Sequence, residues 1–153
     1  MQIKKILNRK EIKKIEEIIE KNYGCKVRLR NMFMTGDEKL WIAGEDVNIV
    51  TLSNLKNCYR IGIYFGRLKR NNKIKLSMEG ATIVGRKARK NIAIVGDKEA
   101  IKFAEGNDIH EYKEIDCEKN NFIIVKRSND IIGVGILRDG YIENLIPKAR
   151  RMR

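Results

Sequence analysis

The sequence predicts an α+β protein of two domains, with an α/β domain over residues 1–88 and a small β-barrel-like domain over residues 89–153. Three observations lead to this class: a well-capped amphipathic helix near the N-terminus, pairs of strands joined by turn residues, and a run of short, regularly spaced strands near the C-terminus. The 153 residues suffice for two small domains, and the hydrophobic fraction of 42% suffices for a packed core.

The first element is a helix that begins after Asn8 and ends at Gly24. Asn8 is a favoured N-cap, and Glu11 stands at the position that completes a capping box. Isoleucines recur on one face from Ile12 to Ile19, which is the spacing of a helix that packs by a single apolar stripe. Glycine ends such a helix because it adopts the left-handed conformation without strain.

Two hairpins follow the helix. The first joins residues 27–34 to residues 39–43, and its first arm alternates apolar and basic residues as a half-buried strand does. The second joins residues 61–70 to residues 73–77 across Asn71-Asn72, because asparagine tolerates positive φ. Together they predict a small antiparallel sheet beside the helix.

A second helix is expected over residues 77–90, with Ser77 as its N-cap. Its last turn would carry Arg86, Lys87, Arg89 and Lys90, next to the negative end of the helix dipole. That electrostatic role explains some of these cations, but one turn does not need four of them.

The last third of the chain is expected to form a strand, a helix and then three further strands. Residues 91–95 are a short apolar strand, and residues 97–106 are a helix that Asp97 caps and Gly106 ends. The three strands are expected over residues 121–127, 131–137 and 141–146. Asp139-Gly140 lies between the last two and is a strong hairpin signal. Short strands at this spacing favour a small β-barrel-like domain.

The cations are concentrated in one part of the chain. The net charge is +13, and residues 56–90 hold eleven Lys and Arg against one acid. Residues 97–118 hold eight Asp and Glu against three Lys. A dense basic block creates a positive field that attracts a polyanion. The alternative is a solvated surface that serves solubility alone.

The sequence offers little for catalysis, metal binding or cofactor binding. Cys25, Cys58 and Cys117 are widely spaced, and His110 is the one histidine, so we expect no metal site. Neither a G-x-G-x-x-G turn nor a P-loop occurs, so we expect no nucleotide cofactor. His110 lies in the acidic stretch IHEYKE and is expected to face solvent, so we expect no enzyme activity. No apolar run approaches the ~20 residues of a membrane span, which favours a soluble, cytoplasmic protein without membrane contact.

Residues 91–140 hold an ordered set of motifs: a strand, a short helix ending at Gly106, and later a strand that runs into Gly133 and Gly135. This order resembles a PUA domain, an RNA-binding pseudobarrel of RNA-modifying enzymes and ribosome-assembly proteins. The upstream segment IGIYFGRLKRNNKIKLSMEGATIVGRKARKN looks like part of the pre-PUA domain of two-domain ribosome-biogenesis proteins. The chain is also similar to the region after the catalytic domain in Sun/Fmu-type RNA cytosine-5 methyltransferases, where an ending like IPKARRMR recurs.

The resemblance implies a pre-PUA-like α/β domain over residues 1–88 and a PUA pseudobarrel over residues 89–153. The methyltransferase catalytic domain is missing, so its chemistry is not implied. What is implied is a non-enzymatic protein that recognises structured ribosomal or transfer RNA. It would act as a ribosome-assembly factor or as a recognition module for a modification enzyme.

The expected RNA-binding residues are mostly cations, because Lys and Arg displace counterions from phosphates. In PUA relatives, RNA meets the region around the first helix with its following glycine, and the last strand. The full set is Arg67, Lys69, Arg70, Arg86, Lys87, Arg89, Lys90, Gly106, Asn107, Lys148, Arg150, Arg151 and Arg153. We expect these residues to converge on one positive surface in the folded chain.

Two further segments leave alternatives open. The cations after Pro147 form either a frayed end or a basic hook, and we favour the hook because Pro147 can end a closing strand and leave them beside the fold. The acidic segment 105–118 should lie away from RNA and is a candidate contact for a basic protein partner. A protein-interaction scaffold in an RNA-processing complex is therefore the alternative function.

Overall fold

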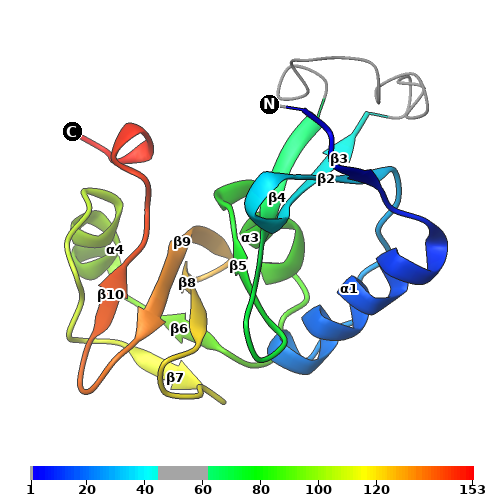
Figure 1. The fold of residues 1–153 in the computed structure, drawn as a ribbon. Helices are drawn as coiled ribbons and strands as arrows, with labels where there is room; N and C mark the ends of the chain where they lie inside the picture. The colour runs from blue at the N-terminus through cyan, green and yellow to red at the C-terminus, as the bar shows by residue number, and fades with distance from the viewer. Residues whose placement is uncertain (1, 45–61) are drawn as a thin grey trace.

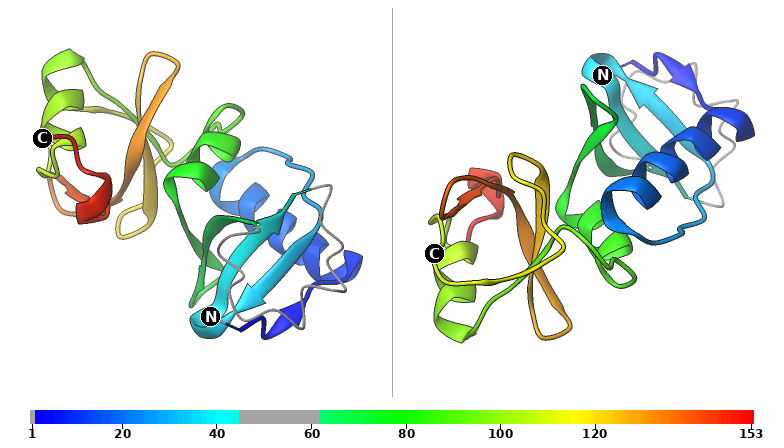
Figure 2. Two further views of the ribbon diagram at one scale, coloured as in Figure 1. Left: turned by 90° about the horizontal axis from the view of Figure 1, so that it is seen from above. Right: turned by 90° about the horizontal axis from the view of Figure 1, so that it is seen from below.

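The protein is seen in a computed structural model that describes residues 2–44 and 62–153 (Figure 1). It is an α+β structure in which two five-stranded sheets are each accompanied by helices. Figure 2 shows the sheets in separate lobes with α3 between them. Lys56, Cys58, Arg60 and Ile61, which entered the sequence predictions, lie outside the described residues.

The first sheet has the order β1-β2-β3-β4-β5, and all its neighbours are antiparallel. One face packs on α1, where Ile15 and Ile19 meet Leu40, Phe65 and Ile74 in one buried cluster. The elements of this half are β1 (Lys5–Ile6), α1 (Arg9–Tyr23), β2 (Met32–Thr35), a 3₁₀ turn (Gly36–Glu38), β3 (Lys39–Ala43), β4 (Gly62–Lys69), β5 (Lys73–Leu76) and α3 (Met78–Gly85).

The second sheet has the order β10-β9-β8-β6-β7, with β6 and β8 parallel. Phe103 of α4 is fully buried against Ile123 and Ile142 on one face. Its elements are β6 (Ile92–Ile94), α4 (Asp97–Ala104), β7 (Lys113–Ile115), β8 (Phe122–Arg127), β9 (Asp130–Leu137), β10 (Ile142–Asn144) and a final 3₁₀ turn (Lys148–Arg150).

A β-barrel-like second domain was expected, and the described strands do not form a closed barrel. The sheet has two ends, β10 and β7. One isolated antiparallel bridge joins Ile109, just before β7, to Ile142 in β10. The segment that leads into β7 therefore touches the opposite edge of the sheet at a single point.

Local signals predicted several ends of elements correctly. Asn8 and Glu11 form the capping box of α1, and Gly24 ends the helix at φ 66°. Asn71 and Asn72 form the β4–β5 turn, both with positive φ. The strand predicted over residues 27–34 begins only at Met32, because the chain turns at Asn31, whose φ is 56°.

Two predictions at helix ends were wrong. α3 ends at Gly85, so Arg86, Lys87, Arg89 and Lys90 follow the helix and do not form its last turn. The chain leaves the helix because the backbone N–H groups of Arg89 and Lys90 donate to the Tyr23 carbonyl at the end of α1.

The second wrong prediction is the cap of α4. Its N-cap is Gly96 and not Asp97, which lies in the first turn. The Asp97 carboxylate accepts a hydrogen bond from Arg127 at 2.7 Å instead. A carboxylate in a first turn is still favourable, because the N-terminus of a helix is its positive end.

The two sheets are joined by apolar packing and by three buried asparagines. Ile92, Ile124 and Val134 of the second sheet belong to the same buried cluster as α1 and the first sheet. Asn91 and Asn121 each donate a hydrogen bond to Asn22 at the end of α1. The junction predicted between residues 88 and 89 lies in the segment that connects α3 to β6.

Candidate nucleic-acid interface

Five cations share one face of the first sheet. Arg67 in β4 stands opposite Lys39 in β3 and Lys75 in β5, and Lys69 stands opposite Lys73. Directly opposed residues lie on the same face of an antiparallel pair, and residues two apart do so as well. We call Lys39, Arg67, Lys69, Lys73 and Lys75 the cationic sheet face.

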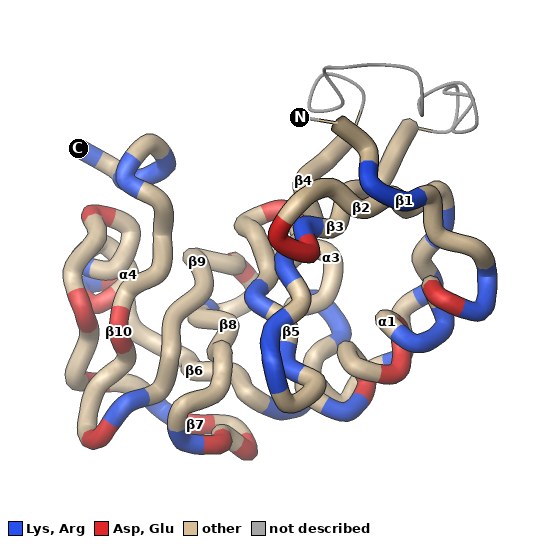
Figure 3. Tube along the Cα trace, viewed as in Figure 1, with Lys and Arg blue, Asp and Glu red and all other residues tan. Residues whose placement is uncertain are grey.

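The other side of these strands is apolar, which fixes the orientation of the cations. Ile74 is fully buried and Leu76 nearly so, and Leu68 packs against the same core. Because side chains alternate along a strand, the intervening Lys73 and Lys75 must point away from that core. Figure 3 shows the Lys and Arg positions along β5.

The cationic sheet face is electrostatically unfavourable as it stands. Like charges directly opposite each other destabilise a strand pair. Burial, followed by repulsion from Lys69 and Arg67, lowers the pKa of Lys75. The Nε of Arg67 is buried and has no hydrogen-bond partner among the described residues. A bound anion would relieve the repulsion among these cations.

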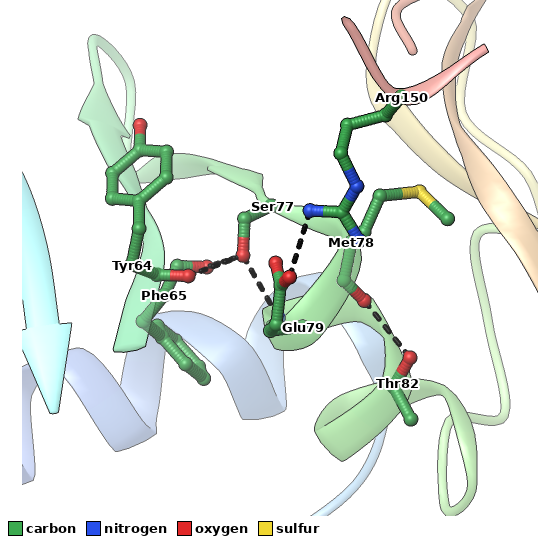
Figure 4. A network of polar contacts seen from close by, with 8 residues as sticks. Tyr64, Phe65, Ser77, Met78, Glu79, Thr82 and Arg150 are labelled. Atoms are coloured by element: carbon green, nitrogen blue, oxygen red, sulfur yellow. Dashed lines mark hydrogen bonds and ion pairs between the residues drawn. The ribbon is translucent and has the colours of Figure 1, made fainter. Parts of the chain in front are cut away.

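The C-terminal tail is attached to the fold at three points. Arg150 donates to the Glu79 carboxylate at 2.8 Å, as Figure 4 shows. Arg151 donates from Nε to the Ile146 carbonyl at 3.1 Å, and the Met152 N–H donates to the Ala104 carbonyl at 2.8 Å. Lys148 and Arg153 remain exposed to solvent.

Gly106 lies directly under Arg151. Its φ is 104°, and a Cβ at this position would lie 2.5 Å from Arg151 Cδ. The neighbouring Asn107 is exposed, and its carbonyl accepts a hydrogen bond from Asn144. The structure therefore brings together Gly106 and Arg151, which were predicted from separate parts of the sequence.

A third basic group lies at the ends of α1 and α3. Lys26, Arg86, Lys87 and Arg89 line a hollow beside Cys25. Burial raises the pKa of the Cys25 thiol, with smaller opposing effects from Lys87 and Arg89. Cations at the C-terminal ends of helices complement the helix dipole, so this group has a structural role of its own. Lys90 lies against Gly24 at the end of α1.

The predicted cations thus fall into separate groups. Arg67 and Lys69 belong to the cationic sheet face, with Arg70 exposed just after β4. The cations of residues 86–90 accompany the ends of α1 and α3, and those after Pro147 belong to the tail. Lys39, Lys73 and Lys75 also belong to the cationic sheet face but were not among the RNA-binding residues predicted from the sequence. The alternation of residues 73–76 offered a signal for two of them, but Lys39 joins the face only through the pairing of β3 with β4.

The remaining chemistry of the described residues is sparse. Among residues 2–44 and 62–153, no three His, Cys, Asp or Glu side chains come close enough to hold a metal ion. In the same ranges, no helix combines the length and the apolar character that crossing a membrane requires. A comparison with protein-family models gives no match to this chain, and a comparison with curated proteins gives none either.

Proposed function

We propose that this chain is a non-enzymatic RNA-binding protein that recognises structured ribosomal or transfer RNA. It acts either as a ribosome-assembly factor or as the recognition module of an RNA-modification enzyme. The observation that carries this proposal is the cationic sheet face, where like charges stand opposite one another across three strands. A protein that holds repelling charges together gains free energy when a polyanion binds them.

RNA is a suitable partner for such a surface. Lys and Arg neutralise phosphates and release condensed counterions, which supplies most of the affinity that does not depend on sequence. Arginine adds a planar fork that binds two phosphate oxygens or stacks on an exposed base. Arg67 and Arg150 provide such forks on the sheet and on the tail.

The resemblance to pre-PUA and PUA domains supports the same proposal. The order of β6, α4 and the bridged residue Ile109 along the chain is the strand–helix–strand order on which the resemblance rests. The bridge between Ile109 and Ile142 is the contact that a pseudobarrel would extend. We include the PUA pseudobarrel as part of the proposal.

The acidic segment 105–118 favours a second candidate, a scaffold that binds a basic protein. Its six carboxylate residues, Glu105, Asp108, Glu111, Glu114, Asp116 and Glu118, are all exposed. Glu111, Glu114, Asp116 and Glu118 lie in β7 or within three residues of it in the chain, and β7 is an edge strand of the second sheet. Purification of the chain from its source cells with a protein partner and without RNA would favour this candidate.

The affinity for labelled transfer RNA at a series of salt concentrations tests the main proposal. We expect the logarithm of the association constant to fall linearly with the logarithm of salt concentration, by about 0.7–0.9 per phosphate neutralised. Binding that does not depend on salt would contradict the proposal, and so would failure to bind both transfer RNA and ribosomal RNA.

A further inference from the structure

A cleft of about 430 Å³ opens between β4, the start of α3 and the chain that follows β10. This volume lies within the range of roughly 300–1,000 Å³ that is usual for pockets that bind small organic groups. The lining combines both halves of the molecule: Tyr64 and Met78 come from the first, and Leu145, Ile146 and Pro147 come from the second.

Most of the lining is apolar, and part of it is open to solvent. Ile63 on β4 keeps 49% of its surface exposed, which makes it one of the exposed large apolar residues of the described chain. Tyr64 is half-buried and lies 5.2 Å from Trp41, centroid to centroid, in a cluster that includes Phe33. Tyr64 therefore ends a packed aromatic group at the wall of the cleft.

The charged groups of the cleft are mainly cationic. Lys75 of the cationic sheet face lines it, and so does Arg150 of the tail. Glu79 is the acid in this lining, and it is already paired with Arg150 at 2.8 Å. In Figure 4, Arg150 comes from the tail to the first turn of α3, while Tyr64 stands on the β4 side.

We propose that this cleft receives one unpaired nucleobase of a bound RNA, whose flanking phosphates lie on the cationic sheet face and on Arg150. The inference rests on the proposed function and specifies how the RNA is recognised. A nucleobase has apolar faces and a polar edge, and its phosphates lie next to it, which matches an apolar cleft with cations in its wall. An uncharged apolar peptide would offer no anionic partner to Lys75.

Stacking of bases on such walls tolerates different sequences, because every base has a π face. Bases inside a duplex cannot enter, whereas bases in loops, bulges and ends are free to turn outward. The cleft therefore favours RNA with at least one unpaired nucleotide, while the cationic sheet face binds phosphates of either form.

The test compares the full chain with the variant Ile63→Ala on three RNAs: a single strand, a duplex, and the same duplex with one bulged nucleotide. Ile101→Ala is the matched control, because Ile101 on α4 is 52% exposed and does not line the cleft. We expect the wild type to bind the bulged duplex about tenfold more tightly than the perfect duplex. Ile63→Ala should lose most of that preference, and Ile101→Ala should keep it, with melting temperatures close to wild type.

A second measurement locates the base directly. A photoreactive base analogue at the bulge should crosslink to peptides that contain Ile63 and Tyr64, or Ile146 and Pro147. Equal binding of bulged and perfect duplex, or crosslinks elsewhere, would overturn the cleft proposal while RNA binding itself stands. If none of the three RNAs binds, the proposed function fails as well.

Discussion

Gly106 follows α4 and packs against Arg151 of the C-terminal tail. Its φ of 104° is rarely adopted by other residues, and a Cβ there would lie 2.5 Å from Arg151 Cδ. Gly106→Ala should therefore destabilise the protein by about 1–3 kcal/mol, through backbone strain and displacement of Arg151. Urea unfolding measures the loss of stability. Gly36→Ala is the control, because a Cβ at Gly36 would meet no atom within 4 Å. Equal losses in the two variants would contradict the prediction.

Lys75 shows the cost of the cationic sheet face at one position. Its pKa is lowered below the ordinary value of 10.5 by burial and then by Lys69 and Arg67. Just below pH 10.5, Lys75 therefore binds a proton more often in the unfolded chain than in the folded one. Its contribution to stability is unfavourable below this pH and becomes less so as the pH rises toward 10.5.

Lys75→Met should therefore raise the melting temperature at neutral pH by about 1–3 °C. The difference in melting temperature between Lys75→Met and wild type should become smaller as the pH approaches 10.5. Lys98→Met, at an exposed position of α4, is the control and should change the melting temperature little at neutral pH. Thermal unfolding at several pH values gives the melting temperatures of both variants. A difference between Lys75→Met and wild type that stays constant with pH would contradict a lowered pKa of Lys75.

At the scale of elements, the sequence predicted what neighbouring residues decide. The capping box of α1, its terminal Gly24, and the Asn71-Asn72 turn all depend on side chains within four residues of the feature. The end of α3 depends instead on hydrogen bonds from Arg89 and Lys90 to Tyr23, more than sixty residues earlier. Local spacing carries no information about such a contact, and it therefore predicted a helix that was too long.

The connection between the two halves depends on Asn22, which is buried at the end of α1. Its side chain donates to the Ile18 carbonyl at 2.7 Å and to the Asn72 carbonyl at 2.8 Å, and it accepts from Asn121 at 3.1 Å. Asn22→Ala removes the acceptor of the buried Asn121 amide and should cost about 1–3 kcal/mol in urea unfolding.

The control for this variant is Asn129→Ala, at an exposed position in the β8–β9 turn, which should cost less than about 0.5 kcal/mol. If Asn22→Ala is as stable as the control, the hydrogen bond from Asn121 to the Asn22 side chain does not stabilise the connection between the two halves.

At the scale of the whole molecule, the site could not be read from local spacing. The density of cations over residues 56–90 pointed to a polyanion, but only strand register decides which of them share a face. Register brings Lys39 beside Arg67, although the two residues lie 28 positions apart in the sequence. In the folded chain, the cations of residues 86–90 lie at the ends of α1 and α3 and not on the cationic sheet face.

This separation of the cations allows position and net charge to be tested independently. One triple variant changes Lys39, Lys69 and Lys73 to Gln on the cationic sheet face, and another changes Lys26, Lys87 and Arg89 to Gln in the hollow beside Cys25. Each lowers the net charge of +13 by three. If the sheet face binds phosphates, the first variant should reduce the salt slope of RNA binding by about 2–3, while the second leaves it nearly unchanged. Equal reductions of the salt slope in the two variants would mean that RNA affinity depends on net charge alone. The cationic sheet face would then not be the interface.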